Sequence, residues 1–203
     1  MLGVLNKASD VTYAHSIGVS LYSTMLAKAV GGGMGSPLVL FKVSMGGLLH
    51  DIGKKELPSE IINRPRHLLS AEEMKIFESH TTRGAEILSR LSFVQSDVVK
   101  IAAQHHENCL GLGYPARLRM AFIHPLARLV SVANEFCNLA IQGPDQVAMT
   151  PAEVIERLSI HQIDSLDPVF FVTLAKLFNV QLDPSYHEAQ RRNKVTPDSK
   201  DST

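Results

Sequence analysis

Residues 48–58 have the sequence LLHDIGKKELP, which joins the end of an apolar segment to a histidine-aspartate pair. The apolar segment after Pro37 predicts a helix that runs from Leu38 to His50, and the turn-prone residues HDIGK then end it. His50 and Asp51 therefore stand next to each other at a helix end. A carboxylate has two oxygens and can bridge two cations, whereas the adjacent imidazole binds only one of them. Alone, the pair is only a weak signal of a metal site.

Helical patterns continue on both sides of this stretch. Apolar residues at helical spacing predict a helix from Ser9 to about Val30, with His15 inside it. Further on, Ser70 and Glu73 have the spacing of a capping box. Other helices are predicted from Ala71 through His80 with a bend at Gly84, from a cap at Ser96 to His105, from about Pro125 to Ala140, and after Thr150-Pro151 and Asp167-Pro168. Because no segment alternates between apolar and polar residues, the predicted fold class is all-α.

The composition is that of an ordinary globular domain, with 203 residues and 45% hydrophobic residues. Lys and Arg together number 20, as do Asp and Glu, so charge gives no argument for a nucleic-acid polymer or a membrane surface as partner. Cys109 and Cys137 are too few for a disulfide framework and suit a reducing cytoplasm. Neither a secretion signal nor a membrane-spanning segment is expected, because the chain has no sufficiently long apolar run.

The expected domain covers residues 1–182. Residues 183–203 are polar and have little to bury, so we expect a disordered tail. The sequence begins almost directly on a helical pattern, which is also expected of a piece cut from a longer protein.

Most of the nine histidines fall on predicted helices or helix ends among apolar neighbours. A single histidine in such a place is usually an ordinary core or surface residue, but a set needs an explanation. Successive residues on a helix point roughly 100° apart, so His105 and His106 would approach a metal from different sides. Together with the helix-end pair and the other histidines, they form a set of nitrogen and oxygen ligands suited to a first-row divalent ion.

Taken in order, eight segments resemble an HD-GYP domain, a branch of the HD phosphohydrolase superfamily. The resemblance covers about residues 11–180, and its segments are YAHSIGVSLYS, LLHDIGKKELP, RPRHLLSAEE, ESHTTRGAEIL, AAQHHE, GLGYP, ARLVSVANEF and LDP. Either HD or GYP alone would be weak, but the eight segments in this order are highly specific. The resemblance implies an HD-domain helical bundle with the C-terminal helices of HD-GYP proteins.

The resemblance also implies a ligand set for two divalent metals, iron or manganese, with the aspartate of the HD pair bridging them. The matching residues are His15, His50, Asp51, His80, His105 and His106. A further family aspartate is replaced by Asn134, whose amide oxygen is neutral and a weaker donor. Glu135 is an alternative ligand, although its direction on the helix differs by roughly 100°. The metal nearest Asn134 is therefore expected to bind less tightly.

Three other positions have counterparts in the family. Some members hold a third metal on a glutamate one turn before the first histidine; that position is Val11 here, so at most two metals are expected. Lys54 resembles the lysine that contacts substrate phosphate, the alternative being a solvated surface lysine. Tyr114 resembles a loop residue that shapes the nucleotide pocket, although Gly113 and Pro115 would also explain a turn with a packed ring.

Two departures from the family concern the substrate. The family commonly has a DG doublet between HHE and GYP, where this chain has Leu110 and Gly111. The basic arginine-proline-tyrosine stretch that usually follows the last metal ligand is absent, and residues 140–144 are AIQGP instead. The base and phosphate contacts carried by that stretch are therefore not expected here.

The implied function is hydrolysis of a cyclic dinucleotide, cyclic di-GMP by resemblance, in bacterial signalling, with Asp51 and Lys54 as catalytic residues. The alternative is a catalytically weakened domain that binds metal or nucleotide and docks signalling proteins such as diguanylate cyclases. A nucleotidase from elsewhere in the superfamily would explain the HD pair but would leave HHE and GYP unexplained.

Overall fold

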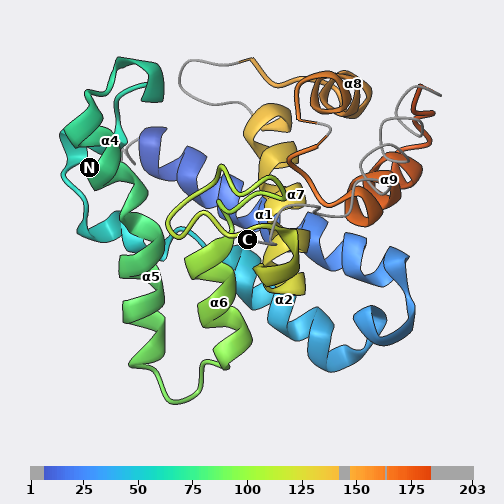
Figure 1. Ribbon diagram of the computed structural model, residues 1–203, viewed down its shortest axis with the longest axis horizontal. Coiled ribbons are helices and arrows are strands. Elements are labelled where there is room, and N and C mark those ends of the chain that lie inside the picture. The colour runs from blue at the N-terminus through green and yellow to red at the C-terminus, as the bar shows by residue number, and fades with distance from the viewer. Residues whose placement is uncertain (1–6, 142–146, 163, 184–203) are drawn as a thin grey trace, which may run out of the picture.

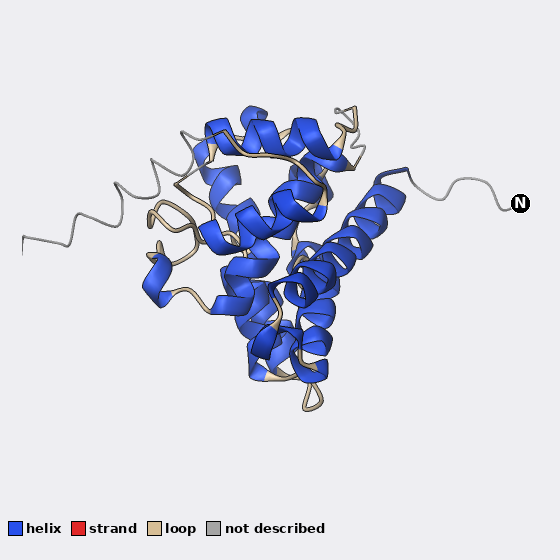
Figure 2. Cartoon of the chain, turned by 90° about the vertical axis from the view of Figure 1, so that its right-hand side faces the viewer, coloured by secondary structure: helices blue, strands red, loops and turns tan. Residues whose placement is uncertain are grey.

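Helices make up nearly all the regular structure in the computed structural model, which describes residues 7–141, 147–162 and 164–183 (Figures 1 and 2). The helices are α1 (Lys7–Val30), α2 (Pro37–Leu49), α3 (Ser59–Ile62), α4 (Ala71–Glu78), α5 (His80–Ser89), α6 (Ser96–Gln104), α7 (Pro125–Ala140), α8 (Pro151–His161) and α9 (Pro168–Leu177). Short 3-10 helices span Gly32–Gly35, Ile52–Glu56, Arg66–Leu68 and Met120–Phe122. These ranges contain no strand, so the all-α prediction is confirmed. Nearly all of the predicted tail, from residue 184 onward, lies outside the described residues.

Side chains cap several helices where the sequence predicts it. The predicted capping box at α4 is present: the Ser70 hydroxyl accepts a hydrogen bond from the Glu73 amide, and the Glu73 carboxylate accepts one from the Ser70 amide. Thr150 and Asp167 cap α8 and α9 in the same positions that the sequence predicts. The predicted cap at Ser96 is wrong, because Ser96 is already the first residue of α6 and Gln95 precedes it without a side-chain cap.

The structure also corrects the predicted bend at Gly84. The chain turns at Ser79, and His80 is the first residue of α5, in which Gly84 is an interior residue. The start of α5 is in close contact with the segment after the HD pair. A Cβ atom on Gly53 would lie 2.0 Å from the His80 carbonyl oxygen, so only glycine fits there. The backbone that follows Asp51 therefore rests directly on the start of α5.

Helix α7 is the centre of the core (Figure 1). It contacts α1, α2, α6, α8 and α9. Its fully or nearly fully buried apolar side chains are Leu126, Ala127, Leu129, Val130, Val132, Ala133, Phe136 and Cys137. Removing these side chains from water supplies much of the favourable free energy of folding. The same rigid helix carries Asn134.

Helix α1 forms as predicted, although its apolar residues do not all face the core. Val19 and Leu26 are fully buried, whereas Ile17, Leu21 and Met25 are 59%, 54% and 39% exposed. Among the described residues, none of the helices combines the length and the hydrophobicity that a membrane span requires.

Candidate metal centre

Three buried histidines are oriented by the same local hydrogen bond. In each ring Nδ1 donates to the carbonyl oxygen three residues earlier, since a carbonyl can only accept. A neutral ring with its proton on Nδ1 has its lone pair on Nε2, the atom that binds metal. The bonds join His50 to Gly47 at 2.7 Å, His80 to Phe77 at 2.6 Å and His105 to Ala102 at 2.9 Å.

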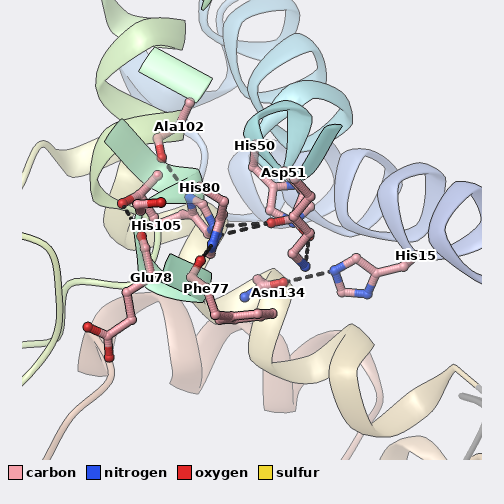
Figure 3. Close-up of polar contacts among 12 residues, drawn as sticks. His15, His50, Asp51, Phe77, Glu78, His80, Ala102, His105 and Asn134 are labelled. Carbon is pink, nitrogen blue, oxygen red and sulfur yellow. Dashed lines mark hydrogen bonds and ion pairs between the residues drawn. The ribbon is translucent and has the colours of Figure 1, made fainter. Parts of the chain in front are cut away.

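The Asp51 carboxylate lies where these three Nε2 atoms converge (Figure 3). Oδ2 is 3.3 Å from Nε2 of His50, and Oδ1 is 3.3 Å and 3.6 Å from Nε2 of His80 and His105. Two of these buried atoms, Nε2 of His50 and Oδ1 of Asp51, have no hydrogen-bond partner. Buried lone pairs without partners are costly unless a cation satisfies them, so this donor set fits a divalent metal.

The ligand atoms form two groups that share Asp51. The first group consists of Asp51 with His80, His105 and His106. The second consists of Asp51 with His15 and His50. Within each group all ligand atoms lie within 4.8 Å of one another. Each group could therefore hold one cation, with a carboxylate oxygen available to either.

Asn134 on α7 lies beside the second group, below Asp51 in the view of Figure 3. Its Oδ1 is 3.0 Å from Nε2 of His15, and its Nδ2 is buried without a partner. An amide oxygen only accepts, so His15 donates through Nε2 in this arrangement. A cation in this group would have to take that nitrogen from Asn134.

Glu135 does not join either group. Its Oε2 accepts a hydrogen bond of 3.2 Å from Nε2 of Gln162, at the end of α8. Burial raises the pKa of the Glu135 carboxyl. The side chain of Val11 lies outside the described residues, as do positions 142–144 of the segment that replaces the family's basic stretch.

The electrostatics of the cluster suit metal binding. Burial lowers the pKa of His15 to about 4 and that of His80 to about 3. Burial alone would raise the pKa of Asp51, but neighbouring His50 and Lys54 hold it well below its usual value. At neutral pH the rings of His15 and His80 are therefore uncharged and the carboxylate is charged, as metal ligands must be.

The metal-free protein is expected to lose stability as the pH falls from about 6.5 toward 4. In this window the unfolded chain binds protons on these histidines while the folded chain does not, so the free energy of unfolding decreases. The loss is on the order of 3 kcal/mol for a ring such as His15. Urea denaturation at several pH values measures it. H80Q should reduce the pH dependence, whereas H161Q, at an exposed position, should leave it unchanged. A constant unfolding free energy would contradict burial of neutral rings.

Glu107, to which the sequence assigns no role, holds the loop that contains the GYP motif. The side chain is 3% exposed, and its two carboxylate oxygens accept hydrogen bonds of 2.7 Å and 2.8 Å from the amides of Ala116 and Leu118. One buried carboxylate thus fastens residues nine and eleven positions ahead. The signal was available in the HHE motif, where the glutamate directly follows two ligand histidines.

The loop that Glu107 holds brings Tyr114 into contact with the candidate ligand His106. Gly113 lies so close to the preceding segment that a Cβ atom would be 2.3 Å from the His106 carbonyl oxygen. The same oxygen accepts a hydrogen bond of 3.1 Å from the Tyr114 amide. The Tyr114 ring stacks on the His106 ring with centroids 4.7 Å apart and 25° between the planes. The peptide bond between Tyr114 and Pro115 is cis.

Two basic residues lie over the ring of Phe77 at the edge of the cluster. Lys54 Nζ is 2.5 Å from Oδ2 of Asp51 and 5.6 Å from the ring centroid. The Arg66 guanidinium is 4.6 Å from the same centroid and donates a hydrogen bond of 3.2 Å to the Tyr114 hydroxyl. Aromatic faces attract cations, so Phe77 orients both. Nothing in the local sequence distinguishes Arg66 from a surface arginine.

Comparison with known proteins agrees with this geometry. The family model described as HD domain matches residues 19–169. Cyclic di-GMP phosphodiesterase PA4108 of Pseudomonas aeruginosa is 32% identical over 155 residues, which is 76% of this chain and 36% of that protein. The 3'3'-cGAMP-specific phosphodiesterase 1 of Vibrio cholerae is 34% identical over 155 residues, 76% of this chain and 35% of its own length. The chain thus spans about a third of these curated relatives.

A solved structure is similar as well. Bd1817, a HDG"Y"P protein from Bdellovibrio bacteriovorus, superposes with a TM-score of 0.69 at 28% identity. The match covers 82% of this chain and 52% of that one. From these matches and the arrangement around Asp51, the chain belongs to the HD-domain family and, within it, to the HD-GYP branch.

Proposed function

We propose that this chain is a metal-dependent phosphodiesterase domain that hydrolyses a cyclic dinucleotide in bacterial signalling, with cyclic di-GMP as the first candidate. The observation that carries the proposal is the pair of ligand groups that share Asp51. Relatives named as cyclic di-GMP and 3'3'-cGAMP phosphodiesterases support the substrate class. We also propose that the protein is located in the cytoplasm, where such nucleotides occur.

Two divalent cations, iron or manganese, would be held by His80, His105 and His106 on one side and by His15 and His50 on the other. Bound there, they would lower the pKa of a water molecule and polarise the phosphodiester. Asp51, which belongs to both groups, would be a ligand on both sides. With only one negative charge among the ligands, the loaded site is strongly positive and attracts an anionic phosphate.

The chain's own residues would position that phosphate. Lys54 lies beside Asp51 with its side chain 24% exposed, so its ammonium can reach both the carboxylate and a phosphate oxygen from solvent. Phe77 limits the directions in which the ammonium can point. Tyr114, stacked on His106, lines a cavity beside that ligand. Lys54 is thus the catalytic lysine of this proposal, and Tyr114 a substrate-binding residue.

The proposal is tested with the purified chain loaded with Mn²⁺ or, without oxygen, Fe²⁺. Metal content is measured, and cyclic di-GMP, 3'3'-cGAMP and cyclic di-AMP are each incubated with the protein. A linear dinucleotide or mononucleotide product is expected. Recovery of all three substrates intact from protein that carries two metals would rule out the proposed activity.

Lys54→Met is expected to lower kcat/KM roughly tenfold to a hundredfold, largely through a higher KM, because a charge-assisted contact to the phosphate is lost. Metal content should stay unchanged, since lysine is not a ligand. Lys55→Met is the matched control: Lys55 is adjacent but exposed, and its loss should leave the kinetics as they are. Equal kinetics for both variants would contradict the role of Lys54.

One observation favours a second candidate, a binding module without turnover. The hydrogen bond between Asn134 and His15 competes with a cation for the second group. If only the first group is occupied, the domain would bind a nucleotide and could dock signalling proteins such as diguanylate cyclases. Tight binding of cyclic di-GMP without product would identify this case.

A further inference from the structure

A cavity of about 390 Å³ opens beside the ligand histidines, on the side of His106. Its volume falls within the range of about 300 to 1,000 Å³ typical of small-molecule sites. Because His105 and His106 form part of its wall, a molecule in it would lie next to the first ligand group. Other side chains that line the cavity include Arg66, Asn108, Leu112, Tyr114, Glu135 and Gln162.

Arg66 and Glu135 bring opposite charges into this cavity without pairing. Among the ion pairs of the described residues, none includes either side chain. Each is held by neutral partners instead: Arg66 by Phe77 and the Tyr114 hydroxyl, and Glu135 by the Gln162 amide. Both groups line the same cavity and neither has an ion-pair partner, so both remain available to a ligand in it.

The rest of the lining includes an apolar surface. Leu112 is 76% exposed although it is apolar, and it belongs to the loop that carries Tyr114. Its amide donates a hydrogen bond of 2.9 Å to Oδ1 of Asn108, which fixes this turn of the loop. An exposed leucine and a tyrosine beside two fixed charges match the lining of pockets that hold flat, polar-edged molecules.

We propose that this cavity is the subsite for one guanine base of the substrate, with Glu135 and Arg66 as its specificity-determining residues. Guanine has adjacent N1–H and N2–H donors, and a carboxylate can accept both. Its O6 and N7 are acceptors, which a guanidinium binds in pairs. Adenine has an acceptor at N1 and a donor at N6 in the corresponding places, so it mismatches the carboxylate and offers the guanidinium only N7.

This inference deepens the proposed function, since it assumes that the substrate is a nucleotide that reaches the ligand cluster. It also addresses the missing basic stretch after α7. Arg66 comes from the segment between α3 and α4 and supplies a guanidinium to this cavity. Only one base is assigned, so cyclic di-GMP and 3'3'-cGAMP, which each contain guanine, should both be accepted, and cyclic di-AMP should not.

The test uses GMP and AMP as probes, since they share the same phosphate and are not substrates of a phosphodiesterase. Binding to the metal-loaded chain is measured by calorimetry, with wild type, E135Q and E60Q. Glutamine replaces one acceptor by a donor, so E135Q should bind GMP about tenfold to a hundredfold more weakly and AMP nearly unchanged. Glu60 is exposed on α3, and E60Q serves as the control.

The outcomes separate this inference from the proposed function. If wild type binds GMP and AMP equally, or if E135Q keeps the preference for GMP, the guanine subsite is wrong even when cyclic di-GMP is hydrolysed. If GMP is preferred and E135Q removes the preference while no cyclic dinucleotide is hydrolysed, the subsite stands and the phosphodiesterase proposal fails. R66K provides a second variant, expected to weaken GMP binding because lysine cannot form the paired contact.

Discussion

Asp51→Asn is expected to remove metal binding and phosphodiesterase activity together. The two ligand groups share this carboxylate, and it is the negatively charged member of both. Its amide replacement is neutral and also brings a donor toward the Nε2 atoms that converge on it. We expect metal content to fall from two ions to one or none, and kcat/KM to fall at least about a hundredfold. Elemental analysis after dialysis and product formation from cyclic di-GMP measure the two effects.

The matched control is Asp97→Asn, in the first turn of α6 and thus at the other end of that helix from His105. Asp97 pairs with Lys42 at 2.7 Å and with His124 at 3.0 Å, so the same change removes a carboxylate from a basic environment without ligands. Its metal content and activity should equal those of wild type. If D51N retains two metals, the shared carboxylate is not what holds them.

Asn134→Asp is expected to act in the opposite direction, strengthening the group formed by His15 and His50. The substitution adds a negative charge at the position whose amide oxygen is 3.0 Å from Nε2 of His15. A carboxylate is a better ligand than a neutral amide, and it offers the cation an oxygen in exchange for the hydrogen bond that is lost. Affinity for the second metal should rise about tenfold or more, and kcat should rise with it if occupancy limits turnover.

Asn138→Asp separates ligation from a general effect of charge. Asn138 is one turn farther along α7, is exposed, and lines the neighbouring cavity with His15 and Lys54. The substitution Asn138→Asp should raise the affinity for the second metal only slightly. Competition with a fluorescent chelator gives both constants. Similar gains in N134D and N138D would show that position 134 contributes charge without ligating.

Much of the fold was predictable because its signals are local. The Ser70 cap accepts a hydrogen bond from a backbone amide three residues later, and the prolines at the starts of α8 and α9 have no amide hydrogen that needs a partner. Both signals lie within a few residues, so spacing alone reveals them. The turn at Ser79 was not predictable. Nor was the close approach of Gly53 to the His80 carbonyl, because a lone glycine does not reveal its contact partner in space.

The site follows the same division. Motifs in family order identify the candidate ligands, and the structure brings five histidines together around Asp51. Glu107 and Arg66 were missed for a different reason. Their partners, the amides of Ala116 and Leu118 and the rings of Phe77 and Tyr114, lie far from them along the chain or across the cavity. The HHE motif places Glu107 beside two ligand histidines, but spacing within a short motif does not reveal which amides or rings a side chain contacts.

The bonds from three imidazole rings to carbonyls of their own chain segments have a mechanical consequence. Because the anchoring carbonyls belong to the ends of α2, α4 and α6, each ring moves as a rigid body with a helix end instead of adjusting alone. Metal–ligand distances tolerate only about 0.2 Å of error, whereas helices shift against each other by about 1–2 Å in switching proteins. Small displacements of these helices would therefore change the affinity for metal. A force applied to the bundle far from Asp51 would weaken metal binding in this way.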